Sequence, residues 1–238
     1  MKNKIFNYIK ENRIITILLI FLMLVLVIIL TCFNHTSKFN KSINNPYDIA
    51  ISSTDNFVFL GDSITEGYPL EELYDDMPVI NSGISGYQTT DILANLDKMV
   101  YIYNPTKVFL LIGTNDLGVG KDKKKVVSNI KLIIKKINNK KPKCKIYLES
   151  IYPINNSDDD KINHETVGVR TNKQIKEVNK SLKEYAKETD NVTYIDVYTE
   201  LLDTNKKELA LKYTKEGLHI TDMGYLKITK ILLPYFND

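Results

Sequence analysis

The stretch NFVFLGDSITEG, residues 56–67, decides the fold. Its apolar residues Phe57–Leu60 are rich in β-formers and run directly into Gly-Asp-Ser. A short apolar run closed by a glycine is typical of a buried strand that ends in a sharp turn. The stretch therefore predicts that Ser63 lies at the carboxyl edge of a sheet, where open α/β folds bind their ligands. Taken alone, this serine could equally cap a following helix, because Ser and Asp are good N-caps.

Apolar strand patterns alternate with helical patterns along the rest of the chain. We expect strands at Phe57–Leu60, Val79–Ile80, Lys107–Ile112, Lys145–Leu148 and Val192–Ile195. We expect helices at Thr89–Tyr101, Lys123–Ile137, Thr171–Lys187 and about Thr221–Leu233. In Lys123–Ile137 the apolar residues recur at intervals of three and four, as on one buried face of a helix. This alternation predicts an α/β fold with a parallel sheet covered by helices on both faces. The long irregular piece Tyr152–Arg170 is polar, and we expect it to form a mobile wall of the site.

The amino-terminal part of the chain has a different character. The run Ile14–Phe33 holds twenty residues without a charge, which is long enough to cross a bilayer as one helix. Four basic residues and one acid precede it, and positive charge on this side favours a cytoplasmic amino end. We therefore predict a cytoplasmic segment 1–13, a transmembrane anchor 14–33, a linker 34–55 and an outer domain 56–238. A cleaved signal peptide, or a lipoprotein modified at Cys32, remains an alternative.

Charge and cysteine content narrow the class of function. The chain carries 32 basic and 29 acidic residues, and residues 36–238 hold 28 of each. A formally neutral outer domain does not suggest a nucleic-acid-binding protein. Two cysteines and three histidines without ligand-like spacing indicate neither a zinc site nor a disulfide framework.

Three further segments stand near predicted strand ends or the carboxyl end of the chain. They are Asn81-Ser82-Gly83-Ile84-Ser85-Gly86, Gly113-Thr114-Asn115-Asp116 and Glu216-Gly217-Leu218-His219. Each is weak alone, since glycine turns and Asn or Asp caps are common. In a doubly wound sheet all of them, with Ser63, can meet at one edge. Together they supply a hydroxyl, an imidazole, a carboxylate, an amide and backbone N–H groups, which are the components of acyl transfer.

With these motifs in this order, residues 56–236 resemble the SGNH hydrolases, also called the GDSL esterase/lipase family. The matching residues are Gly61-Asp62-Ser63 followed by Ile64-Thr65, Gly83 within Asn-x-Gly-x-x-Gly, Gly113-x-Asn115-Asp116, and His219 three residues after an acid. The resemblance implies a three-layer α/β/α sandwich with a flavodoxin-like parallel sheet. It implies no metal and no organic cofactor.

The resemblance also implies roles for individual residues. Ser63 would be the nucleophile and His219 its general base, and the oxyanion hole would comprise the N–H groups of Ser63 and Gly83 with the Asn115 amide. The family usually carries Asp three residues before the histidine, where this chain has Glu216. The longer carboxylate can still fix the imidazole tautomer, although a backbone carbonyl could orient His219 instead. We expect structural roles for Asp62, Asp116, Asp196 and Asp222, and a surface position for His164.

These features predict a membrane-anchored serine esterase whose catalytic domain lies outside the cytoplasm. Its expected substrates are small acyl esters, O-acetyl groups above all, on cell-surface carbohydrate. A lysophospholipase or lipase, and an O-acetyltransferase with the same site, are alternatives. A catalytically inactive surface-binding module is a further alternative, against which the intact Ser63, Gly83, Asn115 and His219 argue.

Overall fold

A computed structural model of the chain describes residues 23, 25, 55–205 and 207–237. The predicted cytoplasmic segment 1–13, anchor 14–33 and linker 34–55 therefore lie outside the described residues, apart from Met23, Val25 and Asp55. Within the described residues, no helix has the length and apolar character needed to cross a bilayer.

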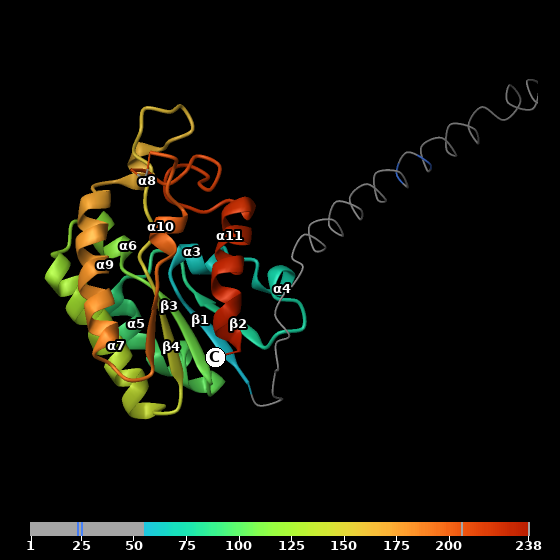
Figure 1. The fold of residues 1–238 in the computed structure, drawn as a ribbon, viewed down its shortest axis with the longest axis vertical. Helices are drawn as coiled ribbons and strands as arrows, with labels where there is room; N and C mark the ends of the chain where they lie inside the picture. Colours follow the sequence, from blue (N-terminus) through green and yellow to red (C-terminus); the bar gives the residue numbers. More distant parts are fainter. Residues whose placement is uncertain (1–22, 24, 26–54, 206, 238) are drawn as a thin grey trace, which may run out of the picture. The chain divides into compact units, whose positions relative to one another are not determined.

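A sheet of five parallel strands forms the centre of this part of the chain (Figure 1). The strands are β1 (Phe57–Gly61), β2 (Val79–Gly83), β3 (Lys107–Leu111), β4 (Lys145–Glu149) and β5 (Val192–Ile195). Their order in the sheet is β2-β1-β3-β4-β5, which is the flavodoxin-like order. The predicted parallel sheet is confirmed, and each strand lies where the apolar pattern placed it.

Four long helices and several short ones connect the strands. The long helices are α5 (Thr89–Met99), α7 (Lys123–Lys140), α9 (Asn172–Lys187) and α11 (Asp222–Leu232), and all four match helices that the sequence predicts. The short elements are α3 (Ser63–Glu66), α4 (Leu70–Leu73), α6 (Thr114–Gly118), α8 (His164–Val167), α10 (Val197–Glu200) and the 3-10 turns η1 (Tyr101–Tyr103) and η2 (Leu233–Phe236).

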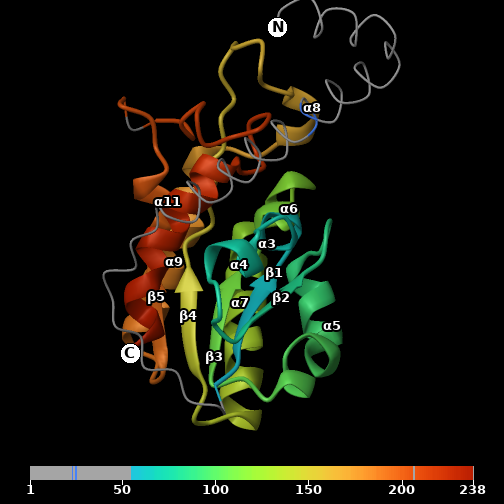
Figure 2. The same cartoon turned by 90° about the vertical axis from the view of Figure 1, so that its right-hand side faces the viewer.

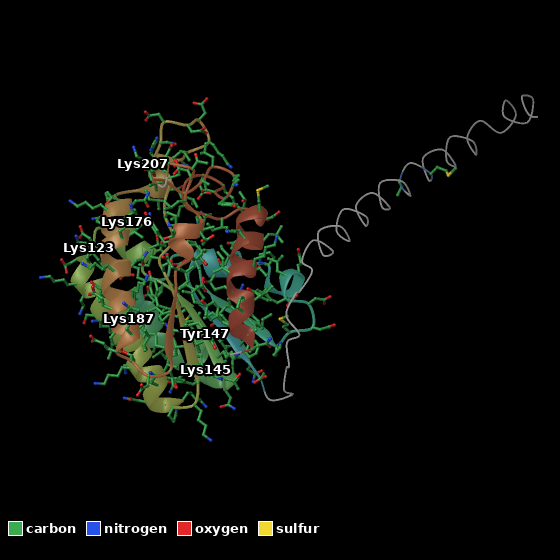
Figure 3. The ribbon with its side chains drawn as sticks, viewed as in Figure 1. Lys123, Lys145, Tyr147, Lys176, Lys187 and Lys207 are labelled. Atoms are coloured by element: carbon green, nitrogen blue, oxygen red, sulfur yellow. The ribbon has the colours of Figure 1, made fainter. Side chains whose placement is uncertain are left out.

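Alternation along the strands separates two apolar layers. Val58, Val108 and Ile146 lie in register and belong to one core cluster with the apolar faces of α5, α7 and α9. The next residues along the same strands are aromatic, and the Phe109 ring stacks on Phe59 at 4.7 Å and on Tyr147 at 4.8 Å. This aromatic layer packs against Phe236 of η2 and, through Tyr68, against Tyr225 of α11. Helix α11 lies across the sheet from α5 and α7 (Figure 2), and Tyr147 lies inside the domain (Figure 3). Helices thus cover both faces of the sheet.

The irregular segment 152–170 is packed more tightly than its polarity suggests. Several of its residues are buried, among them Ile154, Ile162, Val167 and Arg170. Its backbone also pairs with the segment that carries His219, because the N–H groups of Asn155 and Asn163 donate to the carbonyls of Gly217 and Glu216 at 2.8 Å. The segment does form a wall beside His219, whereas its mobility stays a prediction.

Candidate active site

A tight turn between β1 and α3 presents Ser63. Asp62 is the N-cap of α3, and its Oδ1 accepts from the Ile64 N–H at 3.0 Å. A Cβ on Gly61 would lie 2.1 Å from Thr65 Oγ1 and 2.4 Å from the Leu111 carbonyl oxygen. Only glycine therefore allows β1 to turn this sharply into α3. Ser63 consequently occupies the first helical position, where backbone N–H groups have no partner within the helix.

Asp62 itself is fully buried beneath this turn. Its Oδ2 has no hydrogen-bond partner among the described residues. Burial raises the pKa of this carboxyl to about 7, although the Arg170 guanidinium acts in the opposite direction. The expected structural role is confirmed, because the side chain caps α3 and faces no solvent.

Ser63, His219 and Glu216 lie in one hydrogen-bonded row. His219 Nε2 is 3.0 Å from Ser63 Oγ, and His219 Nδ1 is 2.5 Å from Glu216 Oε1. The same carboxylate oxygen accepts from the His219 backbone N–H at 3.0 Å. The carboxylate thus contacts both the ring and the backbone of His219. Of the two arrangements that the sequence left open, the structure shows the Glu216 carboxylate at Nδ1.

A constrained turn holds the histidine toward Ser63. Gly217 has φ +108°, and a Cβ there would lie 2.6 Å from the Asn155 carbonyl oxygen. Thr214 Oγ1 accepts from the Gly217 N–H at 2.7 Å and donates to the His219 carbonyl at 3.0 Å. These bonds close the 214–219 turn on itself, so the Ser63–His219 contact depends on a defined loop shape.

Two of the predicted oxyanion donors have N–H groups to offer. The Ser63 backbone N–H donates to no group within the described residues. Asn115 lies in α6, just beyond β3, where its Nδ2 donates to the Tyr87 carbonyl at 3.0 Å and its Oδ1 accepts from Arg170 Nη2 at 3.0 Å. An amide nitrogen carries two hydrogens, so one N–H of Asn115 remains for a substrate oxygen.

The third predicted donor, Gly83, has a different role in the structure. Its N–H donates to Asn81 Oδ1 at 3.0 Å. A Cβ at this position would lie 2.2 Å from the Glu66 nitrogen and 2.6 Å from the Thr65 carbonyl carbon. Gly83 is therefore required because β2 packs directly on the backbone of α3, and its own N–H is already engaged.

Gly86 is better suited to donate, and the sequence interpretation missed it. Its backbone has φ +77°, a Cβ added there would have no atom within 4 Å, and its N–H donates to no group within residues 55–205 and 207–237. The carbonyl of the next residue, Tyr87, is the group that accepts from Asn115. Gly86 is the second glycine of Asn-x-Gly-x-x-Gly, so the sequence motif did contain the residue.

Arg170 is a second residue that the sequence interpretation missed. It lies at the end of the irregular segment, yet its guanidinium is buried and contacts Asn115. Residues 56–238 contain 26 basic residues, and Arg170 is the only arginine among them. In a chain that otherwise uses lysine, a lone arginine indicates a position that needs the forked guanidinium.

The remaining polar residues have the structural or surface positions expected for them. Asp116 is buried and accepts from the Thr89 N–H and Oγ1, both at 2.8 Å. Asp196 caps α10, and Asp222 is exposed in the first turn of α11. His164 is exposed, with Nδ1 2.7 Å from Asn156 Oδ1.

A serine, a histidine and a carboxylate in contact at the carboxyl edge of a doubly wound sheet define the α/β class of serine acylhydrolases. Residues 59–227 match the GDSL-like Lipase/Acylhydrolase family. The chain belongs to this family and is an acylhydrolase that acts on ester bonds.

Solved structures show the same fold. A candidate platelet activating factor from Streptococcus pneumonia is 32% identical, with a TM-score of 0.71 over 89% of this chain and 98% of that one. A GDSL-like lipase from Bacteroides thetaiotaomicron is 22% identical, with a TM-score of 0.68 over 86% and 96%. A catalytic mutant of an acetylxylan esterase from Geobacillus stearothermophilus is 19% identical, with a TM-score of 0.60 over 78% and 95%. The last two likenesses concern the fold alone. No curated protein matches the chain.

Proposed function

We propose that this chain is a membrane-anchored serine esterase that acts outside the cytoplasm and removes small acyl groups, O-acetyl above all, from cell-surface carbohydrate. One observation carries the reaction type: the 3.0 Å contact of Ser63 Oγ with His219 Nε2, whose ring is held by Glu216. A free serine hydroxyl is a weak nucleophile near neutral pH, and an adjacent base activates it.

In the first half of the reaction, His219 Nε2 takes the proton of Ser63 Oγ as this oxygen bonds to the ester carbonyl carbon. The Glu216 carboxylate accepts from Nδ1 and stabilises the imidazolium that forms. The carbonyl oxygen becomes an oxyanion, for which we propose the N–H groups of Ser63 and Gly86 and the free N–H of Asn115 as donors. Collapse of this intermediate breaks the bond to the alcohol, which leaves with the proton from His219.

In the second half, water hydrolyses the acyl-enzyme by the same route. His219 takes a proton from the water as its oxygen bonds to the acyl carbon, and it returns that proton to Ser63 Oγ as the acid leaves. An O-acetyltransferase would differ only here, because a sugar hydroxyl would take the place of water.

Two observations support a small acyl group on carbohydrate. The site is open to solvent, since the side chains of His219 and Glu216 are 36% and 22% exposed. Among the structurally similar proteins is an acetylxylan esterase. The proposed location depends on the uncharged run 14–33 and the basic residues before it.

A second candidate function is hydrolysis of longer acyl chains by a lysophospholipase or lipase. It is favoured by apolar side chains that are exposed on segments adjoining the site. Ile84 is 37% exposed, Met223 is 55% exposed and Val169, next to Arg170, is 61% exposed. Such side chains can contact an acyl chain or a lipid surface.

Hydrolysis of p-nitrophenyl esters of increasing acyl length tests both candidates, with Ser63→Ala as the control. We expect acetate to give the highest kcat/KM and Ser63→Ala to abolish turnover. A maximum at octanoate or longer would favour the lipase. Failure of a fluorophosphonate to label Ser63 would favour a binding module without catalytic activity.

Fractionation of cells that express the full chain tests the location. We expect the protein in the membrane fraction, and we expect external protease to remove the catalytic domain from intact cells. A protein that is released by washing, or that is protected until the cells are lysed, would contradict the proposed anchor and its orientation.

A further inference from the structure

Arg170 makes a set of hydrogen bonds that join α6 to α8. Its side chain is buried, and Nε donates to the Thr114 carbonyl at 2.9 Å and to Thr114 Oγ1 at 3.1 Å. Nη1 donates to the carbonyls of Thr166 and Val167 at 3.0 and 2.8 Å. Nη2 donates to Asn115 Oδ1 at 3.0 Å. All three guanidinium nitrogens are therefore engaged, and one of them contacts a proposed oxyanion donor.

The contact with Asn115 determines which way its amide points. A side-chain amide has an accepting oxygen on one side and a donating nitrogen on the other. With Oδ1 held by Arg170 and one Nδ2 hydrogen held by the Tyr87 carbonyl, the second hydrogen has a defined direction. In the flipped amide, NH₂ would face the N–H of Arg170, and both contacts would be lost. A charge-assisted hydrogen bond of this kind is about twice as strong as one between neutral groups, so it favours one orientation of the amide strongly.

The surroundings are shaped for an arginine. A Cβ on Gly118 would lie 2.3 Å from both Cζ and Nη2 of Arg170, so the glycine leaves room for the guanidinium. Lysine would bring a single nitrogen on a flexible stem and could not reproduce donation from three nitrogens in one plane.

We propose that Arg170 is a positioning residue of the oxyanion hole, which holds the Asn115 amide so that one N–H points toward the developing oxyanion. The inference rests on the proposed function. Since Arg170 acts through Asn115, its loss should slow the chemical step and leave substrate binding nearly unchanged.

A double-mutant cycle in the full-length protein tests this with p-nitrophenyl acetate. We expect Arg170→Met to lower kcat about ten- to a hundredfold with KM changed less than twofold, and Arg170→Lys to recover only part of the loss. In the Asn115→Ala background, Arg170→Met should cause little further loss, because its target is already absent. Lys121→Met is the matched control, since Lys121 donates to buried Asp116 beside Asn115 and should leave kcat unchanged.

An equal loss of kcat in both backgrounds, or an unchanged kcat in Arg170→Met, would overturn the proposal. If Arg170→Met does not fold, the same comparison is made with Arg170→Lys. A second readout does not need activity: the two side-chain N–H signals of Asn115, assigned by their absence in Asn115→Ala, should shift and exchange faster with water in the Arg170 variant. Unchanged signals would also overturn the proposal. A wild-type protein without Ser63-dependent hydrolysis would instead remove the proposed function, and the amide signals would still decide the role of Arg170.

Discussion

At the residue scale, two carboxyl groups near the nucleophile are distinguished by their surroundings. Asp62 directly precedes Ser63 but is fully buried, and it caps α3. Glu216 is partly exposed and contacts the ring of His219. A group that orients and stabilises a histidine must contact the imidazole. Glu216 is therefore the carboxylate partner of His219, although Asp62 is much closer to Ser63 in the sequence.

Replacing Glu216 by Gln should lower kcat at least about a hundredfold, because an amide can turn its NH₂ toward Nδ1 and stabilises the imidazolium less. Ester hydrolysis at saturating substrate measures the effect. Asp222→Asn is the control, since Asp222 is exposed at the start of α11 and should leave kcat near that of the wild type. Wild-type turnover in Glu216→Gln would remove Glu216 from the mechanism.

Glu149 should make stability depend on pH. It is buried at the end of β4 and accepts from the Tyr152 hydroxyl, and burial raises the pKa of its carboxyl to about 7. A raised pKa means that the folded state favours the protonated form. The stabilisation is therefore complete below pH 4.5 and is lost as the pH rises through about 7.

Urea unfolding at pH 5 and pH 8 measures this dependence. The unfolding free energy of the wild type should fall relative to Glu149→Gln by on the order of 2 kcal/mol between the two pH values. Glu165→Gln, at an exposed site on α8, is the control. Its unfolding free energy should differ from that of the wild type by the same amount at both pH values. A constant difference for Glu149→Gln would show that Glu149 does not titrate in this range.

At the element scale, β2 and α3 approach so closely that a single methyl group decides their contact. Gly83→Ala should lower the unfolding free energy by about 2–3 kcal/mol and reduce activity, because α3 carries Ser63 and must shift away from the new Cβ. Gly120→Ala is the control. An alanine at the Gly120 φ of +76° costs about 1 kcal/mol, but the nearest atom to its Cβ would be 3.9 Å away, so no clash adds to this cost. Urea unfolding and ester turnover are measured for both variants. Equal losses of stability and activity in Gly83→Ala and Gly120→Ala would contradict the packing of β2 on α3.

The sequence predicts elements that are long enough to show an apolar run or a helical periodicity, and it does not predict shorter ones. The apolar run of strand β3 (Lys107–Leu111) and the periodic face of α7 are local sequence patterns that follow directly from burial. The four-residue helices α4, α8 and α10 are little longer than one turn, so no periodicity marks them. The site shows the same limit. Motifs located Ser63, His219 and Asn115, whereas the Arg170–Asn115 bond joins residues 55 positions apart and leaves no local pattern.

At the scale of the whole molecule, the carboxyl-terminal turn η2 completes the aromatic layer under the sheet. The Phe236 ring lies 5.1 Å from Phe57 and from Phe109 and stacks on Tyr74 at 4.8 Å. Phe236→Ala should therefore lower the unfolding free energy by about 3–4 kcal/mol. Met223→Ala, which truncates a side chain that is 55% exposed, should change it by less than about 0.5 kcal/mol. Equal stabilities would show that residues 233–236 do not contribute to the core.

The same contact has a consequence for how the protein can be handled. Phe57 opens β1 and touches Phe236, while Ser63 follows the opposite end of that strand (Figure 1). Both ends of the domain therefore lie at the amino-terminal edge of the sheet, opposite the carboxyl edge that carries Ser63. A carrier protein or a solid support joined at residue 56 or after residue 237 should therefore leave the active site accessible to bulky polymeric substrates. Because these ends are neighbours, a short linker between them should also permit circular permutation.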